Sequence, residues 1–133
     1  MFDRMVLALS AALMLATPAG AKDCPTQDFG FDAREGAVRA ALSCREALEV
    51  MEACAYGASG DTGLGEIVVA KCKGDFLAKL NKAQRQTYDR GIKRCDGKYK
   101  NESGTMYRSM EAFCRATLAR DTAAKLAKAP PRK

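Results

Sequence analysis

Residues 81–126, NKAQRQTYDRGIKRCDGKYKNESGTMYRSMEAFCRATLARDTAAKL, decide the fold that this sequence predicts. In their first part the apolar positions recur every three or four residues and so share one side of an α-helix: Tyr88, Ile92, Cys95 and Tyr99. A second helical pattern follows with the same spacing: Tyr107, Met110, Cys114, Thr117 and Leu118. The polar residues 101–104 between the two patterns predict a turn, with Ser103 as the N-cap of the second helix.

The two patterns predict an antiparallel helical hairpin closed by a disulfide. Because the turn is short, Cys95 and Cys114 come to similar heights on neighbouring helices. A bond between them would close a loop of about 20 residues and stabilise the fold by roughly 3 kcal/mol in the chain-entropy description. Asn81 and Gln84 have the spacing of a capping box at the start of the first helix. Gly91 indicates either a close approach of a neighbouring helix or a locally weak helix.

The N-terminus predicts an export signal. A short charged lead at residues 1–4 precedes an almost wholly apolar run at 5–16, and Pro18 and small residues follow up to Ala21. This order is typical of a secretory signal peptide cleaved after Ala21. A membrane anchor is the alternative, but the apolar run is shorter than the roughly 20 residues that span a bilayer.

The cysteines indicate an oxidising compartment, either the periplasm or the exterior of the cell. There are six, all beyond the predicted cleavage point: Cys24, Cys44, Cys54, Cys72, Cys95 and Cys114. An even number in a small exported chain is typical of a disulfide framework. Metal binding is the rival interpretation, but the chain has no histidine and no Cys-x-x-Cys pair. Apart from the hairpin pair, the pairing stays open.

The chain divides into four predicted segments: a signal peptide at 1–21, an N-terminal arm at 22–32, a helical domain at 33–126 and a basic flexible tail at 127–133. After signal cleavage no apolar run reaches spanning length, so we expect a protein that does not cross a membrane. We expect the arm to be tied down by Cys24 and by Phe29 or Phe31 packing on the helices.

The first part of the domain predicts one long helix, capped by Asp32 and continuing to about Tyr56. Its apolar stripe has helical spacing: Ala37, Ala40, Ala41, Cys44, Leu48, Met51 and Ala55. The many alanines supply helix propensity and allow close contacts with other helices.

A glycine-rich loop at 57–63 then leads to shorter helices, with Asp61 or Thr62 as the next N-cap. The next helix carries a short apolar stripe: Leu64, Ile67, Val68 and Cys72. We expect Gly74 and Asp75 to interrupt it, because glycine costs about 1 kcal/mol inside a helix. Since no alternating strand pattern is present, the sequence predicts an all-α, disulfide-stapled bundle of four or five short helices.

The sequence does not predict an enzyme. Histidine is absent, and no serine or cysteine lies in a motif that would activate it as a nucleophile. Met51, Met106 and Met110 are expected to fill the core, since soft-metal sites have denser clusters of methionine and histidine. We therefore expect no catalytic residue, no metal ligand and no cofactor.

The remaining activity is the binding of a partner through the protein surface. The net charge of +6 affects which partners we expect. The charges are interspersed, which favours solubility or attraction to anionic envelope surfaces rather than nucleic acid. Candidate partner-binding residues crowd the predicted turn of the hairpin: Glu102, Ser103, Thr105, Tyr107 and Arg108. Tyrosine and arginine often anchor interfaces, and a disulfide-held turn loses less entropy on binding. The alternative is a well-capped turn with Tyr107 half-buried.

The hairpin also resembles a known family. The matching positions run along both helices and the turn: LNKAQR at 80–85, Tyr88, Cys95, GTM at 104–106 and Cys114. They resemble the lysozyme-inhibitor LprI N-terminal-domain family, which consists of small exported bacterial helical domains. Upstream, MEACA at 51–55 and Asp61 roughly match the first helix of that family, so the resemblance covers residues 44–126.

The chain departs from the family pattern in two places. Gly91 and Ile92 stand where the family has an Arg-Asp pair, and Cys24 and Cys72 look like an additional cysteine pair. If the Arg-Asp pair matters for the family's activity, this departure affects that activity here.

The resemblance implies an exported periplasmic binding protein that recognises a lysozyme-type hydrolase or another envelope component by its surface. The alternative is a structural or stress-related envelope protein that binds anionic cell-wall polymer or lipid. A chain at +6 repels a basic lysozyme at long range, so hydrolase binding would depend on a local acidic patch. Two patches are available: Glu102 with Glu111, and Glu46 with Glu49 and Glu52.

Overall fold

The computed structural model describes residues 22–130, and this part of the chain is all helical, as the sequence predicts, with no strand. Five α-helices and one 3-10 helix follow one another: α1 (Phe31–Ala40), α2 (Cys44–Cys54), α3 (Asp61–Phe76), η1 (Leu77–Lys79), α4 (Lys82–Lys98) and α5 (Thr105–Lys128). The helical region thus extends two residues beyond each end of the predicted domain, 33–126. The predicted signal peptide at 1–21 and the last tail residues, 131–133, lie outside the described residues.

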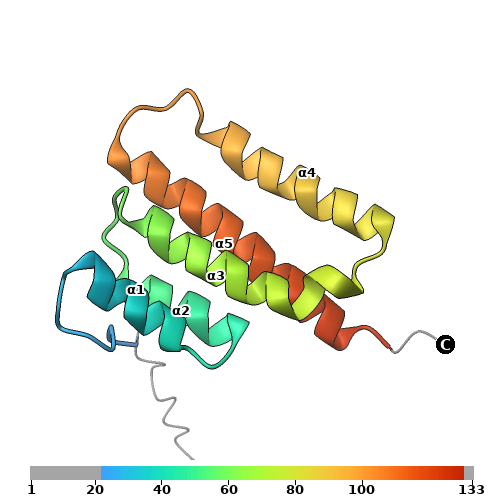
Figure 1. Cartoon of the computed structure of the whole chain (residues 1–133). Helices are drawn as coiled ribbons and strands as arrows, with labels where there is room; N and C mark the ends of the chain where they lie inside the picture. Colours follow the sequence, from blue (N-terminus) through green and yellow to red (C-terminus); the bar gives the residue numbers. More distant parts are fainter. Residues whose placement is uncertain (1–21, 131–133) are drawn as a thin grey trace, which may run out of the picture.

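Helices α3 and α5 form the centre of the bundle. Helices α3 and α5 lie side by side and run in the same direction, with the largest interface of the fold between them (Figure 1). Helix α4 runs back along α5, and α1 and α2 cover α3 on the other side. The apolar core lies mainly between α1, α2, α3 and α5, and its largest fully buried hydrophobic side chains are Phe76, Leu48, Met51, Leu64, Val38 and Val68.

Helix α5 packs against α3 through small side chains. Its buried residues share one face: Ser109, Ala112, Ala116 and Ala119. A Cβ atom on Gly65 of α3 would lie 3.1 Å from the carbonyl oxygen of Ala112, so glycine allows the two backbones to approach closely. The apolar stripe predicted for this helix, from Tyr107 to Leu118, instead lies toward α4 and is only partly buried or exposed.

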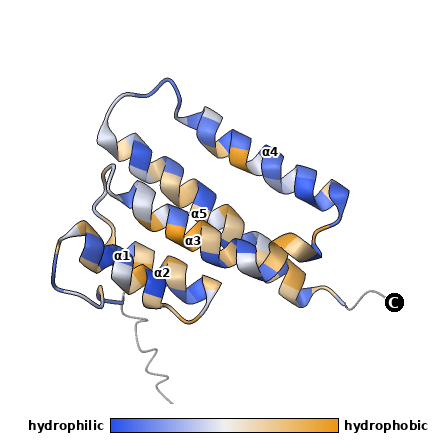
Figure 2. Cartoon of the chain, in the orientation of Figure 1, coloured by the Kyte–Doolittle hydropathy of each residue, from blue (hydrophilic) through white to orange (hydrophobic). Residues whose placement is uncertain are grey.

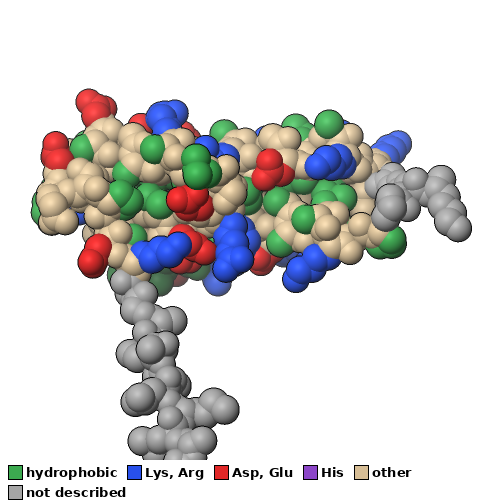
Figure 3. All heavy atoms as spheres, turned by 90° about the horizontal axis from the view of Figure 1, so that it is seen from below, with side chains coloured by type: hydrophobic (Ala, Val, Ile, Leu, Met, Phe, Trp, Pro, Cys, Tyr) green, Lys and Arg blue, Asp and Glu red, His purple; other side chains and the backbone are tan. Residues whose placement is uncertain are grey.

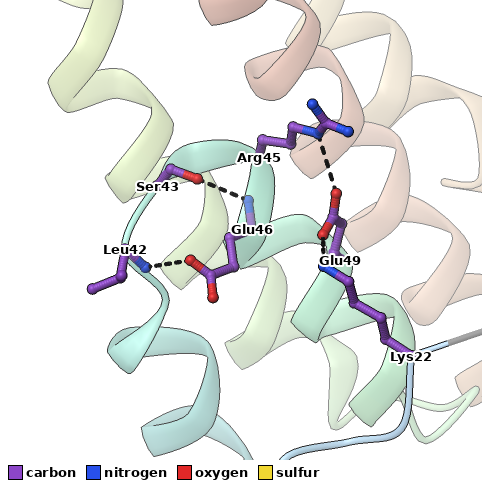
Figure 4. Close-up of polar contacts among 6 residues, drawn as sticks. All are labelled: Lys22, Leu42, Ser43, Arg45, Glu46 and Glu49. Carbon is purple, nitrogen blue, oxygen red and sulfur yellow. Dashed lines mark hydrogen bonds and ion pairs between the residues drawn. The ribbon is translucent and has the colours of Figure 1, made fainter.

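The single helix expected over residues 32–56 is wrong, because α1 and α2 are separate. Ser43 caps α2, with its Oγ accepting from the backbone N–H of Glu46 at 3.1 Å. The carboxylate of Glu46 in turn accepts from the backbone N–H of Leu42 at 2.8 Å (Figure 4). Lys71 of α3 donates to two carbonyl oxygens at this junction. The polar groups freed by the break are thus partly satisfied by side chains.

The interruption expected at Gly74 and Asp75 is also wrong, since α3 continues to Phe76. Gly74 and Asp75 are both exposed. Phe76 is fully buried and packs edge-on against Tyr88, with 5.0 Å between the ring centroids. Burying a phenylalanine contributes about 1.5–3 kcal/mol, which exceeds the cost of about 1 kcal/mol for one helical glycine.

The two helices of the hairpin begin differently. Helix α4 has the predicted capping box: Gln84 N donates to Asn81 Oδ1 at 2.8 Å, and Asn81 N donates to Gln84 Oε1 at 2.9 Å. The N-cap of α5, however, is Gly104 with φ of 112°, and no side chain caps the helix, so the prediction for Ser103 is wrong. A left-handed φ of this kind favours glycine.

Three disulfides staple the bundle, and no cysteine among the described residues is free. They join Cys24 to Cys54, Cys44 to Cys72, and Cys95 to Cys114. The last is the pair that the hairpin favours. The additional pair suggested for Cys24 and Cys72 is wrong, because α2 separates them: the arm is bonded to the end of α2, and α3 to its start. Three disulfides in so small a chain are typical of an oxidising environment.

Helix α4 is the most exposed helix of the bundle. Its only buried residues are Tyr88, Gly91 and Cys95, and Figure 2 shows that most of its residues are hydrophilic. A Cβ atom on Gly91 would lie 2.6 Å from Leu118 Cδ2, so close helix approach is the correct interpretation of this glycine. Nowhere in residues 22–130 is there a helix with the length and apolarity that a membrane span requires.

Candidate functional site

Three connections meet at one end of the molecule, on the left of Figure 1. They are the arm before α1, the loop between α2 and α3, and the turn before α5. We call this region the loop end and define it by residues 28–32, 56–61 and 102–110.

Asp61 joins two of these connections from inside the protein. Its side chain is fully buried, and its Oδ1 accepts from the backbone N–H of Tyr56 at 2.7 Å. Its Oδ2 accepts from the backbone N–H of Gly57 at 2.9 Å and from the hydroxyl of Ser109 on α5 at 2.6 Å. Asp61 therefore does not cap α3, as the sequence suggested, but fixes the preceding loop against α5.

Arg34 holds the third connection, the arm before α1, against the end of α2. Its side chain is buried, and it donates to the carbonyl oxygens of Cys54 and Ala55 at the end of α2. The guanidinium carbon lies 4.4 Å from the ring centroid of Phe29 and 4.6 Å from that of Tyr56, within the range of cation–π attraction. The hydroxyl of Tyr56 donates to the carbonyl oxygen of Phe29 at 2.9 Å. The arm is thus held by one arginine and two aromatic rings.

The rings of the arm nevertheless face solvent. Phe29 is 74% exposed and Phe31 is 62% exposed. Phe29 lies on a helix, as expected for one of the two rings, because it contacts Arg34 of α1, but neither ring enters the core. Phe31 instead lies against Tyr56, with 5.3 Å between centroids. Met106 and Met110 of α5 are also exposed, contrary to the core role expected for them, whereas Met51 is fully buried as expected. Apart from Leu42, every large hydrophobic side chain exposed in residues 22–130 lies at the loop end.

The predicted partner-binding residues also lie at the loop end: Glu102, Ser103, Thr105, Tyr107 and Arg108. The first three are exposed, and Tyr107 is half-buried with its ring 6.2 Å from that of Tyr99. Arg108 points along the helix to Glu111, 3.2 Å away, and both line a hollow of about 260 Å³ between α3 and α5. Glu111 is therefore already paired, which weakens the acidic patch expected from Glu102 and Glu111.

The acidic patch expected on α2 is also partly neutralised. Glu49 pairs with Lys22 and, at 3.2 Å, with Arg45 (Figure 4). The hydrogen bond from Lys22 lowers the pKa of the Glu49 carboxyl below its ordinary value. Glu46 accepts from the backbone at the start of α2, so Glu52 is the one member of this patch that is exposed without such a contact to another described residue.

The arm supplies acidic groups that the sequence interpretation overlooked. Residues 28–32 read DFGFD, so an exposed carboxylate flanks each exposed ring. Asp28 accepts from the backbone N–H of Gly30 at 2.7 Å, which shapes the bend between the rings. Neither Asp28 nor Asp32 has an ion-pair partner within residues 22–130. The alternation of aromatic and acidic residues beside a glycine is the signal that sequence reasoning could have used.

Charge is divided between the two parts of the chain. Residues 22–76 contain six basic and ten acidic residues, a net charge of −4, whereas residues 77–130 contain thirteen basic and five acidic residues, a net charge of +8. Charges of both signs thus occur in each part, as expected, but the net charge differs in sign between the two parts. Seen from below, on the side of α1 and α2, acidic side chains lie among basic and apolar ones (Figure 3).

Comparisons of this chain with models of protein families, with curated proteins and with solved structures find no match. The resemblance to the LprI N-terminal-domain family therefore depends on the residues of the hairpin and remains a prediction.

Proposed function

We propose that this chain is an exported periplasmic binding protein that recognises a lysozyme-type hydrolase through the loop end and catalyses no reaction itself. The observation that supports this most is the DFGFD segment at 28–32, where Phe29 and Phe31 are exposed beside carboxylates that have no ion-pair partner within residues 22–130. Aromatic side chains, phenylalanine included, are enriched at protein interfaces, and the rim around them is polar.

The difference in net charge between the two parts of the chain weakens the main objection to a basic partner. Many lysozymes are strongly basic, and a uniform charge of +6 would repel them. The aromatic anchors belong to residues 22–76, which carry a net charge of −4, while the positive charge resides in residues 77–130. A basic hydrolase approaching the arm would therefore meet a locally attractive surface.

The contacts beneath the loop end support binding with little loss of entropy. The Cys24–Cys54 disulfide ties the arm to α2, Arg34 lies under the ring of Phe29, and Asp61 fixes the neighbouring loop. A surface already held in one conformation pays less ordering entropy when a partner binds.

An inhibition assay against a panel of lysozymes tests the proposal. We expect wild-type protein to slow at least one basic lysozyme at micromolar concentration. The double variant Phe29→Ser/Phe31→Ser should need at least about tenfold more protein, the loss typical of removing interface anchors. Leu42→Ser is the matched control, because Leu42 is 93% exposed but lies at the α1–α2 junction.

Two results would refute this proposal. One is the absence of inhibition across the panel at micromolar protein. The other is an equal loss of inhibition in the Leu42→Ser and Phe29→Ser/Phe31→Ser variants, because the effect would then be unspecific.

A second candidate function is supported by the basic residues of α4. This helix carries six lysines and arginines and two aspartates, and all six basic residues are exposed. Such a surface would attract anionic cell-wall polymer or lipid. Binding to peptidoglycan or to anionic vesicles should then weaken steeply as salt is added, and salt-independent binding would contradict it.

A further inference from the structure

An open groove runs between α4 and α5. It consists of two hollows of about 750 and 390 Å³, which adjoin each other because Arg94 and Leu118 line both. Volumes of this size fall within the range of about 300–1,000 Å³ that is usual for small-molecule sites.

The floor of the groove is apolar and held in place. Its apolar lining includes Leu80, Met110, Phe113, Leu118 and Leu126. The Cys95–Cys114 disulfide fixes the two helices to each other beneath it, and the isobutyl group of Leu118 rests against Gly91. The groove is therefore formed before any ligand arrives.

The charged residues at the rim are mostly basic. Arg94 and Lys98 line the groove from α4, and Lys125 lines it from α5. Within residues 22–130, neither Arg94 nor Lys125 has an ion-pair partner. The one acidic residue of the rim, Asp121, is paired with Arg120 at 2.8 Å. The rim therefore has a positive charge that the protein itself does not neutralise.

We propose that this groove binds a long-chain carboxylate of the fatty-acid type, a ligand independent of the hydrolase bound at the loop end. The alkyl chain lies along the floor over Leu118 and Phe113, where it is removed from water. The carboxylate accepts hydrogen bonds from the guanidinium of Arg94, which is suited to bidentate contact with a carboxylate. An apolar floor with few charged groups at the rim is the composition expected of such a site.

Binding of dodecanoate below its micelle concentration tests this proposal, with calorimetry for affinity and amide NMR shifts for location. We expect saturable binding with shifts at Thr117 and Leu118. Acetate, which lacks the chain, and dodecyltrimethylammonium, which has the opposite charge, should bind at least about tenfold more weakly, the loss expected without one charge-assisted hydrogen bond or the buried chain.

Adjacent residues of α4 provide the matched variants. Arg94→Glu should weaken dodecanoate binding by about tenfold or more, whereas Lys93→Glu changes the net charge equally outside the groove and should have little effect. Circular dichroism of both variants verifies that the helices remain folded. Equal losses would mean general attraction of anions to the basic helix and would overturn the proposal.

Three other results would also overturn the proposal. They are no binding of dodecanoate, equal binding of dodecyltrimethylammonium, and a dimer in light scattering that dodecanoate does not dissociate, which would assign the groove to a second copy. The Phe29→Ser/Phe31→Ser variant separates the two proposals, because it should lose hydrolase inhibition and keep dodecanoate binding.

Discussion

Residues 22–76 and residues 77–130 are held together in different ways. The first part has two disulfides, a core of large buried side chains and the buried carboxylate of Asp61. The second part is a hairpin with one disulfide, in which α5 buries only small residues and α4 buries three residues in all. The first part is acidic and the second is basic.

Within this arrangement α4 is an outer helix, held less tightly than the helices that pack around α3. Helix α3 and α5 pack closely along their length, whereas α4 depends on α5, on Tyr88 and on the Cys95–Cys114 bond. Elements with few buried contacts open at lower free energy than the core of a protein. We therefore expect substitutions of equal size to cost more in the α3–α5 interface than in the α4–α5 groove.

Asp61→Ala should have the largest effect. The substitution removes the acceptor of three hydrogen bonds, one from the buried hydroxyl of Ser109 and two from the partly buried backbone N–H groups of Tyr56 and Gly57. We expect the free energy of unfolding to fall by about 3 kcal/mol or more, measured by urea denaturation.

Ser109→Ala is the control, because it removes one of the three contacts and should cost about 1 kcal/mol. If Asp61→Ala cost no more than Ser109→Ala, Asp61 would not be what holds the loop end together.

A pair of glycine substitutions compares the two interfaces directly. In Gly65→Ala the new Cβ meets the backbone and Cβ of Ala112 at 3.1 Å, and this close packing should cost about 1–2 kcal/mol. In Gly91→Ala the new Cβ meets only the end of Leu118, which can turn into the open groove. The helix propensity of alanine, about 1 kcal/mol better than glycine, should then nearly balance the strain.

Chemical denaturation of the two variants measures both values. A larger loss in Gly91→Ala than in Gly65→Ala would contradict the view that α4 is the more adaptable helix.

Tyr88→Phe should have a smaller effect, of opposite sign. The hydroxyl of Tyr88 is buried without a hydrogen-bond partner among the described residues, so its removal should raise the free energy of unfolding by about 1 kcal/mol. Burial also raises the pKa of this phenol above 10.0.

The raised pKa predicts a pH dependence. Below pH 10 the phenol is neutral in both the folded and the unfolded protein, so the contribution of its protonation to the free energy of unfolding is fully present. This contribution is lost as the pH rises through the higher pKa of the folded protein. Wild-type protein should therefore lose stability more steeply than Tyr88→Phe above pH 10. Identical profiles would place Tyr88 in a more polar environment than its burial indicates.

Local signals predicted much of this fold. The capping box of Asn81 and Gln84, the helical stripe around Tyr88 and the Cys95–Cys114 pair all depend on residues close in sequence. A further local signal was overlooked: Ser43 followed three residues later by Glu46 has the capping spacing that begins α2.

Long-range contacts explain what the sequence did not predict. Aspartate is a residue type that often caps helices, so the sequence around Asp61 predicts an N-cap. Its hydrogen bond with Ser109, 48 residues away, is what links the loop before α3 to α5. The continuation of α3 past Gly74 depends on Phe76 meeting Tyr88 of another helix. The small residues on the face of α5 around Ala112 are explained by Gly65 of α3, which lies opposite them in the fold.

Mapping of the disulfides in protein produced in an oxidising compartment tests the central claim most directly, since each bond joins elements that the fold brings together. Protease digestion without reduction, followed by mass spectrometry, should recover three linked pairs: Cys24 with Cys54, Cys44 with Cys72, and Cys95 with Cys114. A Cys24–Cys72 link, or a majority of free thiols, would contradict the stapled bundle and the loop end that it supports.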